Sequence, residues 1–336
     1  MSEPVIIKRG IEIELEIESL AYGGMGLARI DNFVIFVKYA IPGQKVLARI
    51  YKKRKGYAEA QVLETLVESP NAVDVCCKHY WICSKIQSLS YDEQIKEKSS
   101  QVEDAFVRLG GFLNFKLDKV QKANLIYHYR NKMEFTFSPN RWVLESEPEG
   151  VDKSFALGLH IPGRFDKILD IHNCHIQPEI GNKILAVARE VCLANPELRP
   201  YDPRSHIGFL RFLMLRFGVN TGDLMVNVVT SYHDIDKLSP LIDLLLEKFP
   251  EITSLVNNVN TRKADVAFGE YETLLYGKPF IQEKIGDLTF EISANSFFQT
   301  NTTQGEVLYK EVEEALELRG DEIIYDLYCG TAVSYT

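Results

Sequence analysis

The sequence has few of the features that mark a secreted or membrane protein. It holds 6 cysteines in 336 residues, too few and too unevenly spaced for a secreted disulfide framework. No apolar run reaches the length of a membrane-spanning helix, and the start, Met1-Ser2-Glu3-Pro4, is not typical of a signal peptide. We therefore expect a cytoplasmic protein with no membrane partner.

An excess of positive charge is also missing. Lys and Arg number 38 against 47 Asp and Glu, and this net charge of -9 argues mildly against a nucleic-acid partner. One segment departs from this balance, because residues 44–58 contain no acidic residue but carry the cations Lys45, Arg49, Lys52, Lys53, Arg54 and Lys55. Such a run is either a surface that meets phosphates or a lysine-protected strand edge, and both interpretations stay open here.

The amino-terminal part is rich in short strand patterns. Residues 11–18 alternate Ile or Leu with Glu, which is typical of a half-buried strand. Further short apolar runs, separated by glycine and proline turns, cover residues 33–37, 45–50 and 58–63. Several short strands without a helix predict a small barrel over residues 1–68.

Residues 69–280 mix helical and strand patterns and predict a central α+β domain. Apolar residues at helical spacing indicate a helix over residues 91–109 that Gly110 and Gly111 end. By the same criteria we expect two more helices, over residues 180–191 and 238–245, and two strands, over residues 132–137 and 224–229.

A third part, residues 281–336, begins with a strand over 288–292 and a helix over 307–316. It ends on an apolar run at 323–325 followed by Asp326 and Gly330, the pattern of the first parallel strand of a nucleotide-binding α/β domain. Parallel strands are covered on both faces, so more elements would have to follow. We expect the chain to open this Rossmann-like domain without completing it, giving a mixed fold of OB-like barrel, α+β domain and the start of an α/β domain.

Three motifs together resemble one known family, the RNA uracil-5-methyltransferases, which use S-adenosylmethionine. The motifs are Tyr-Arg-Asn-Lys-Met-Glu-Phe at 129–135, Ser-Phe-Phe-Gln-Thr-Asn at 296–301 and Asp-Leu-Tyr-Cys-Gly-Thr at 326–331. Their order and spacing agree with the family over essentially the whole chain. The resemblance makes the barrel a TRAM domain that binds RNA and residues 281–336 the start of a class I methyltransferase domain, on which helix 91–111 is expected to pack.

The resemblance implies that Gln299 and Tyr328 contact the cofactor, with Asp326 and Gly330 in the same crevice. An amide can bond the amino-acid end of the cofactor, and a ring can line the end of the strand. Taken without the resemblance, residues 296–301 are more simply explained as a buried aromatic pair with an amide that caps the next helix. Cys329 belongs to the cofactor loop, and we expect it to be structural rather than catalytic.

The implied reaction is methylation of uridine C5 in RNA, with 23S ribosomal RNA favoured over transfer RNA. The family's nucleophilic cysteine and base are expected beyond Thr336, so no catalytic residue is assigned and the chain alone is expected to be inactive. Two alternatives remain, a catalytically dead RNA-binding protein and a non-functional truncated product. We expect a monomer.

The residues expected to meet RNA are basic and lie on predicted strands. Aromatic Tyr51 and Tyr57 interleave with the first group, and rings of this kind stack on bases while cations follow phosphates. Arg211 and Arg216 are weaker candidates. The RNA-binding residues that we predict are Lys52, Lys53, Arg54, Lys55, Arg130 and Lys132.

Many members of the family hold a 4Fe-4S cluster on four cysteines, and thiolates are the usual ligands of such clusters. By resemblance the ligands here are Cys77, Cys83 and Cys174, while Ser84 stands where a third nearby cysteine is expected. Cys76 is a poor substitute because adjacent cysteines rarely direct both sulfurs at one metal. An impaired cluster and an empty site both remain open.

Overall fold

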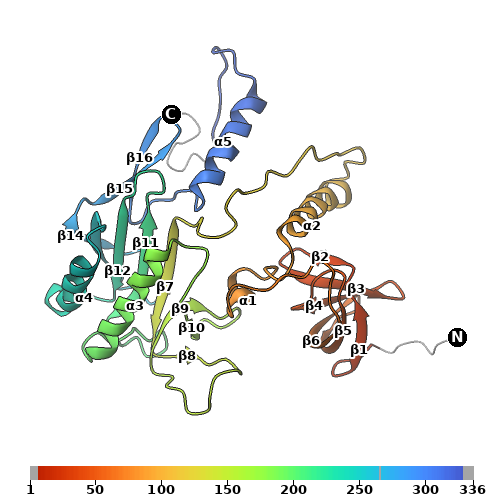
Figure 1. Ribbon diagram of the computed structural model, residues 1–336, viewed down its shortest axis with the longest axis horizontal. Helices are drawn as coiled ribbons and strands as arrows, with labels where there is room; N and C mark the ends of the chain where they lie inside the picture. The colour runs from red at the N-terminus through yellow and green to blue at the C-terminus, as the bar shows by residue number, and fades with distance from the viewer. Residues whose placement is uncertain (1–6, 265, 328–336) are drawn as a thin grey trace. The chain divides into compact units, whose positions relative to one another are not determined.

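The computed structural model describes residues 7–264 and 266–327 and divides into two compact units, Met1–Lys122 and Ala123–Thr336 (Figure 1). Each is described by itself. The predicted domain boundaries at 68 and 280 stay predictions. Among the described residues no helix has the length and the apolar character needed to cross a membrane.

The first unit is built on a six-stranded sheet in the order β1-β5-β6-β4-β3-β2. Ile13 and Leu15 of β1 are buried while the glutamates between them are exposed, so the alternation predicted from the sequence is confirmed. The strands are β1 Glu12–Glu16, β2 Ser19–Ala21, β3 Met25–Ile30, β4 Phe33–Lys38, β5 Lys45–Lys53 and β6 Tyr57–Val67.

The sheet curls because its two edge strands are almost continuous in sequence. Only Ile17 and Glu18 separate β1 from β2, although these strands lie at opposite ends of the strand order. Where the edges meet, Gly26 of β3 approaches Ile17 and Ala40 so closely that an added Cβ would lie 2.9 Å from the Ile17 side chain. The predicted small barrel is confirmed, with a core that includes Ile35, Val46 and Ile50.

Helices follow the barrel in the same unit. The short helix α1 spans Tyr80–Cys83, and α2 spans Tyr91–Asp104 and continues as a π-helical turn, η1, over Ala105–Leu109. Gly110 caps this turn and Gly111 has a φ of 73°, so the predicted helix and its glycine end are confirmed. The backbone of Leu20 in β2 donates to Glu97 of α2 at 2.8 Å. Packing of this helix on the methyltransferase part stays a prediction.

The second unit holds an eight-stranded mixed sheet in the order β14-β13-β12-β11-β7-β9-β10-β8. Its strands are β7 Lys132–Ser138, β8 Arg141–Trp142, β9 Ala156–His160, β10 Ile168–Asp170, β11 Leu210–Phe217, β12 Leu224–Thr230, β13 Ser254–Val259 and β14 Tyr271–Gly277. Strands β12 and β13 are parallel, because helix α4, Ile235–Lys248, connects them. Helix α3, Glu179–Ala194, packs against α4 on one face of the sheet (Figure 1).

A hairpin and a helix complete the second unit. Strands β15, Phe280–Ile285, and β16, Leu288–Ser293, pair with each other, and α5 spans Thr302–Leu316. Met225 and Val256 of the large sheet pack with Phe290, Ile292 and other apolar residues of this segment. Burial of these side chains fixes the hairpin, and with it the start of α5, against the sheet.

The prediction of a strand at residues 323–325 is wrong. Residues 321–326 have no regular secondary structure, and Ile323, Tyr325 and Leu327 are more than four-fifths exposed. A strand forms only where a neighbour satisfies its backbone groups, and no described strand pairs with this segment.

Candidate cofactor and RNA sites

The loop that joins β16 to α5, residues 294–301, contains the Phe-Phe-Gln motif and is anchored at its start by Arg216 of β11. The guanidinium donates to the carbonyl of Ala294 through Nε at 3.2 Å and Nη2 at 3.1 Å, and Nη2 also donates to the carbonyl of Ser296. Burial lowers the pKa of Arg216 to about 10, and Glu134 opposes this shift. Arg216 therefore stays charged at neutral pH and holds the loop through its backbone.

Asn131, the residue before β7, anchors the other end of the loop. Its side-chain nitrogen donates to the Gln299 carbonyl at 2.7 Å and to Thr302 Oγ1 at 2.8 Å, and its backbone N–H donates to the Thr300 carbonyl at 2.9 Å. Two of the motifs singled out in the sequence thus meet in space. The contact between them is made by the amide of Asn131 rather than by the neighbouring cations.

A buried carboxylate supports the same corner. Glu283 of β15 is fully buried and accepts hydrogen bonds from the backbone of Val219 at 2.8 Å and Asn220 at 2.9 Å, and from Thr302 Oγ1 at 2.8 Å. A buried carboxylate is costly unless such donors surround it. Glu283 joins the turn after β11 to the start of α5. Sequence reasoning missed it because nothing near Glu283 in the chain marks it as buried.

Within the loop the two phenylalanines differ. Phe298 is buried against Phe290, with ring centroids 6.0 Å apart, whereas Phe297 is 66% exposed. Asn301 caps α5, because its side-chain oxygen accepts from the Gln304 N–H at 3.1 Å. The helix-capping amide considered from the sequence is therefore Asn301, which leaves Gln299 for another role.

Gln299 is half-buried beside the first turn of α5. Its side-chain amide makes no hydrogen bond to any residue that the structure describes, and Gly305 of α5 lies next to it. Asn131 holds Gln299 by its backbone carbonyl, while the side-chain N–H groups and oxygen of Gln299 have no partner among the described residues. Such an amide is suited to contact a ligand. Asp326 is partly buried, while Tyr328, Cys329 and Gly330 lie outside the described residues.

The basic run on the barrel divides into paired and exposed cations. Lys45 lies 2.7 Å from Glu14, Arg49 lies 2.6 Å from Glu12, and Lys52 forms an ion pair with Glu59. Lys53, Arg54 and Lys55, at the turn between β5 and β6, are exposed. We name these three residues the β5–β6 tip.

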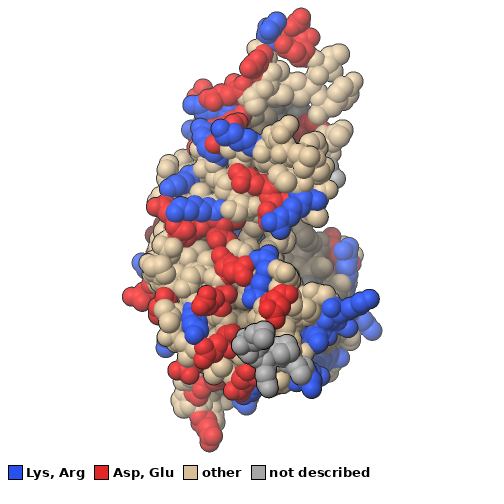
Figure 2. All heavy atoms as spheres, turned by 90° about the vertical axis from the view of Figure 1, so that its right-hand side faces the viewer, with Lys and Arg blue, Asp and Glu red and all other residues tan. Residues whose placement is uncertain are grey.

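Lysine side chains of the barrel also lie over aromatic rings. The ammonium of Lys52 is 5.9 Å from the Tyr57 ring centre, and that of Lys38 is 4.7 Å from the Tyr51 ring centre. Tyr51 donates to Glu59 at 2.9 Å, and burial together with this carboxylate raises the pKa of Tyr51. Tyr51 therefore remains a neutral donor. Figure 2 shows Lys and Arg side chains gathered densely at the lower right of one face, while both signs mix over the rest.

The other predicted cations have different surroundings. Lys132 lies 2.5 Å from Glu134, and Arg130 donates through Nε to the Lys132 carbonyl at 2.9 Å. Arg211 is buried and donates to the carbonyls of Asn260 at 2.8 Å and Ala264 at 2.6 Å. Arg211 and Arg216, considered as RNA contacts, are thus structural residues of the sheet.

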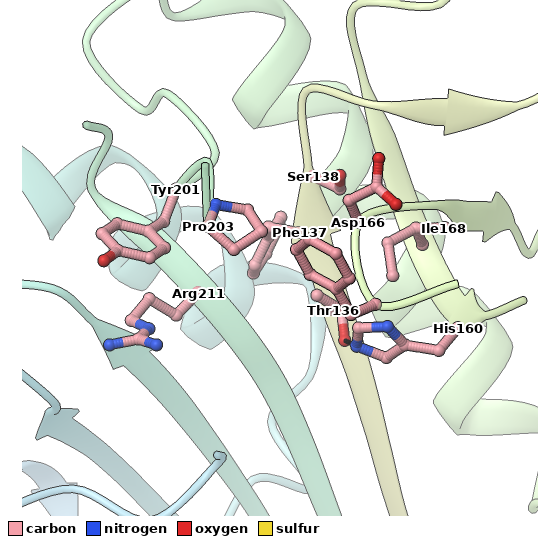
Figure 3. Close-up of a pocket in the computed structure, with 10 residues that line it drawn as sticks. Thr136, Phe137, Ser138, His160, Asp166, Ile168, Tyr201, Pro203 and Arg211 are labelled. Atoms are coloured by element: carbon pink, nitrogen blue, oxygen red, sulfur yellow. Dashed lines mark hydrogen bonds between the residues drawn. The ribbon is translucent and has the colours of Figure 1, made fainter. Parts of the chain in front are cut away.

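Arg211 also lines a small pocket with Tyr201, Thr136, His160 and Asp166 (Figure 3). The polar groups of this pocket contact one another or other protein groups. Thr136 Oγ1 lies 3.1 Å from His160 Nε2, buried Asp166 pairs with Arg204, and the Arg211 guanidinium is 4.3 Å from the Tyr201 ring centre. We interpret this pocket as a gap in packing.

The cysteines expected to bind a cluster are divided between the two units. Cys76 Sγ lies 3.3 Å and Cys77 Sγ 3.9 Å from the side-chain oxygen of Gln87. Burial raises the pKa of Cys77 to about 11, with the Cys76 and Cys83 thiols adding to the shift. Cys174 is buried in the other unit. No three His, Cys, Asp or Glu side chains are grouped to hold a metal among the residues described. Cys77 and Cys83 belong to the first unit and Cys174 to the second, so their assignment as cluster ligands stays a prediction.

Comparison with known proteins agrees with these features. A TRAM domain matches residues 8–63. The chain is 39% identical over 327 residues to an RNA methyltransferase of Porphyromonas gingivalis, covering 94% of this chain and 70% of that protein. It is 41% identical over 297 residues to an RNA methyltransferase of Chlorobaculum tepidum, and this match covers 86% of this chain and 61% of that protein. Both relatives are themselves uncharacterized.

A solved structure has the same fold. The tRNA (uracil-54, C5)-methyltransferase of Pyrococcus abyssi, in complex with S-adenosyl-L-homocysteine, matches with a TM-score of 0.65 at 24% identity. The match covers 90% of this chain and 64% of that one. The protein is a member of a TRAM-containing class of RNA-modifying enzymes. It belongs to the RNA methyltransferase family of these relatives.

Proposed function

We propose that this chain is the RNA-binding and loop-positioning part of an S-adenosylmethionine-dependent RNA methyltransferase that acts on uridine C5. The observation that carries the proposal is the anchoring of residues 294–301 at both ends, by Arg216 and Asn131, through the loop's own backbone carbonyls. This arrangement presents the Gln299 amide and the exposed Phe297 ring to a ligand while leaving both side chains unconstrained by the anchor. The uracil-5 enzyme of Pyrococcus abyssi, which shares the fold, supports the choice of reaction.

When bound, S-adenosylmethionine would supply an electrophilic methyl group. Gln299 would hold its amino-acid end, and Asp326 and the residues after it would complete the site. Uridine C5 is a weak nucleophile and needs a thiolate at C6 and a base to remove the C5 proton. The residues described here would bind RNA and orient the loop. The preference for 23S ribosomal RNA over transfer RNA is part of this proposal.

Deletion of the gene in its host tests the reaction independently of the activity of the isolated chain. Nucleoside mass spectrometry of purified 23S ribosomal RNA and of transfer RNA should show loss of 5-methyluridine from the ribosomal RNA. Complementation with the gene should restore the methyl group. Unchanged 5-methyluridine in both RNAs would exclude the proposed reaction, and loss from transfer RNA alone would exclude the ribosomal preference.

The main competing function is RNA binding without methyl transfer. It is favoured by the exposed β5–β6 tip, which needs no cofactor to meet phosphates. The same deletion strain separates the two, because a binding protein would leave every 5-methyluridine in place while the purified chain still shifts RNA in a gel.

A further inference from the structure

A hollow of about 660 Å³ opens at the end of the large sheet. Its walls are the connection between α3 and β11, the connection between β12 and α4, and the residues after β13. The parallel strands β12 and β13 both end there, at Thr230 and Val259. In α/β sheets the carboxyl ends of parallel strands are the usual place for a ligand.

An aromatic platform forms one wall of this hollow. The rings of Phe209 and Tyr232 lie 4.8 Å apart at an angle of 43°, with Phe209 buried and Tyr232 42% exposed. Lys237 of α4 lies 5.5 Å from the first ring centre and 5.3 Å from the second, and donates to the Tyr232 hydroxyl at 2.9 Å. The Tyr232 ring is thus fixed by its neighbours while part of its surface stays open, as stacking on a base requires.

Basic side chains surround the platform. Arg199, His206 and Lys263 line the hollow and are exposed, and the Arg199 Nε donates to the Pro196 carbonyl at 3.1 Å, which orients its guanidinium. Glu197 is the one acidic residue among those that line it. Its carboxylate lies 4.0 Å from the Lys237 ammonium, which is also 3.8 Å from Asp234.

Lys237 is therefore partly neutralised by carboxylates, and it serves chiefly to hold Tyr232 in place. The positive charge that a ligand would meet comes from Arg199 and Lys263. An exposed ring with flanking cations matches the chemistry of a nucleotide, whose base is flat and whose phosphates are anionic.

We propose that this hollow binds one nucleotide of single-stranded RNA, with the base on Tyr232 and the adjacent phosphates on Arg199 and Lys263. The proposal rests on the proposed function and adds to it a second RNA contact. The hollow adjoins the start of β11 at Leu210, whereas Arg216 near its other end holds the Phe-Phe-Gln loop. A strand rises about 3.3 Å per residue, so roughly 20 Å separates the backbone of Leu210 from that of Arg216. The RNA would follow the sheet between them.

The test uses the full chain and a fluorescein-labelled oligouridylate of about ten nucleotides, within the site sizes known for single-strand binders. Affinity is measured by fluorescence anisotropy for wild type, Tyr232→Leu, Tyr232→Phe and the double variant Arg199→Gln with Lys263→Gln. Lys183→Gln, which removes an exposed lysine of α3, is the matched charge control. A blunt RNA duplex of similar length serves as the competing ligand, since its bases are already stacked.

We expect Tyr232→Leu to bind about tenfold more weakly and Tyr232→Phe to bind as wild type does, because the stacking surface and not the hydroxyl meets the base. The double variant should lower the slope of log affinity against log salt by about 1.4, since each lost phosphate contact is worth about 0.7 for single strands. Lys183→Gln should show neither the weaker binding nor the lower slope. The hollow variants should not change the binding of the duplex. If Tyr232→Leu does not fold, the double variant carries the test, because both of its positions are exposed.

Photocrosslinking locates the contact. The same oligonucleotide with 4-thiouridine should crosslink to the peptide that contains Tyr232, as identified by mass spectrometry. Wild-type affinity in the hollow variants, with crosslinks confined to the barrel, would overturn this inference and leave the proposed function standing. Absence of RNA binding by the wild-type chain would instead contradict the proposed function itself.

Discussion

The side-chain amide of Asn131 donates to the backbone carbonyl of Gln299 at 2.7 Å, across a separation of 168 residues. This bond joins the start of the central strand β7 to the loop that carries the Phe-Phe-Gln motif. It places Gln299 by its main chain and leaves its side chain available. Two segments that the family motifs mark are thereby parts of one structural corner.

Loss of the Asn131 side chain should loosen this corner. Asn131→Ala leaves the Gln299 carbonyl and Thr302 Oγ1 without their donor, and removal of one partner of a buried hydrogen bond costs about 1–3 kcal/mol. Urea denaturation should show this loss, and hydrogen exchange should quicken at residues 300–305. Asn140→Ala, which removes an amide bonded to Asp202 instead, should leave exchange in this loop unchanged. Equal exchange in both variants would contradict the anchor.

Charge alone should not replace Arg216. Arg216→Lys keeps the positive charge but cannot place donors on both the Ala294 and Ser296 carbonyls, because an ammonium lacks the planar fork of the guanidinium. We expect a loss of about 2 kcal/mol in unfolding free energy and faster exchange at residues 296–298. Arg262→Lys, an exposed arginine paired with Glu270, is the control and should be nearly neutral. A fully stable Arg216→Lys protein would show that charge, not geometry, holds the loop.

Alkaline pH should destabilise the second unit through Cys192. Burial raises the pKa of its thiol from 9.0 to about 12, so the folded state retains the proton more strongly than the unfolded chain. The stabilisation is complete below pH 9 and is lost as pH rises through about 12. By about pH 10 the wild type should lose roughly 1 kcal/mol that Cys192→Val, of similar volume, does not lose. Denaturation at paired pH values tests this, and the two proteins should run parallel below about pH 8.

The β5–β6 tip should account for more of the salt-sensitive RNA binding than the other cations of the barrel. Replacing Lys53, Arg54 and Lys55 by Gln should lower the slope of log affinity against log salt by up to about 2. The double variant Lys45→Gln with Arg49→Gln should change this slope less, since Glu14 and Glu12 already neutralise these charges. Gln299→Ala should not alter the slope. Equal slopes for the tip variant and wild type would place the phosphate contacts elsewhere.

Local periodicity predicted much of the fold. The alternation in residues 11–18 became β1, and the apolar spacing with the glycine pair gave α2, η1 and their end at Gly110. These features depend on neighbours within a few residues, which the sequence displays directly. Strand β13 was not predicted from the sequence because Asn257 and Asn258 lower its strand propensity. Their amides are buried in the sheet, where Asn257 donates to the Val228 carbonyl at 2.9 Å.

Within the candidate sites, the sequence pointed to the segments but not to the partners. The motifs identified Gln299 and the basic run, yet the sequence did not show that Lys45, Arg49 and Lys52 face carboxylates, or that Arg211 and Arg216 are buried among carbonyls. Each of these pairs depends on strand order and register, which bring together residues far apart in the chain.

The sequence by itself therefore determined the type of most elements, the family and the position of its motifs, because these follow from short-range pattern. Only the tertiary structure decided which cations remain exposed, which arginines became part of the sheet and how Asn131 came to hold Gln299. The physical reason is that a charged or polar side chain is neutralised or satisfied by whatever the fold places beside it. That neighbour is set by the packing of the whole sheet.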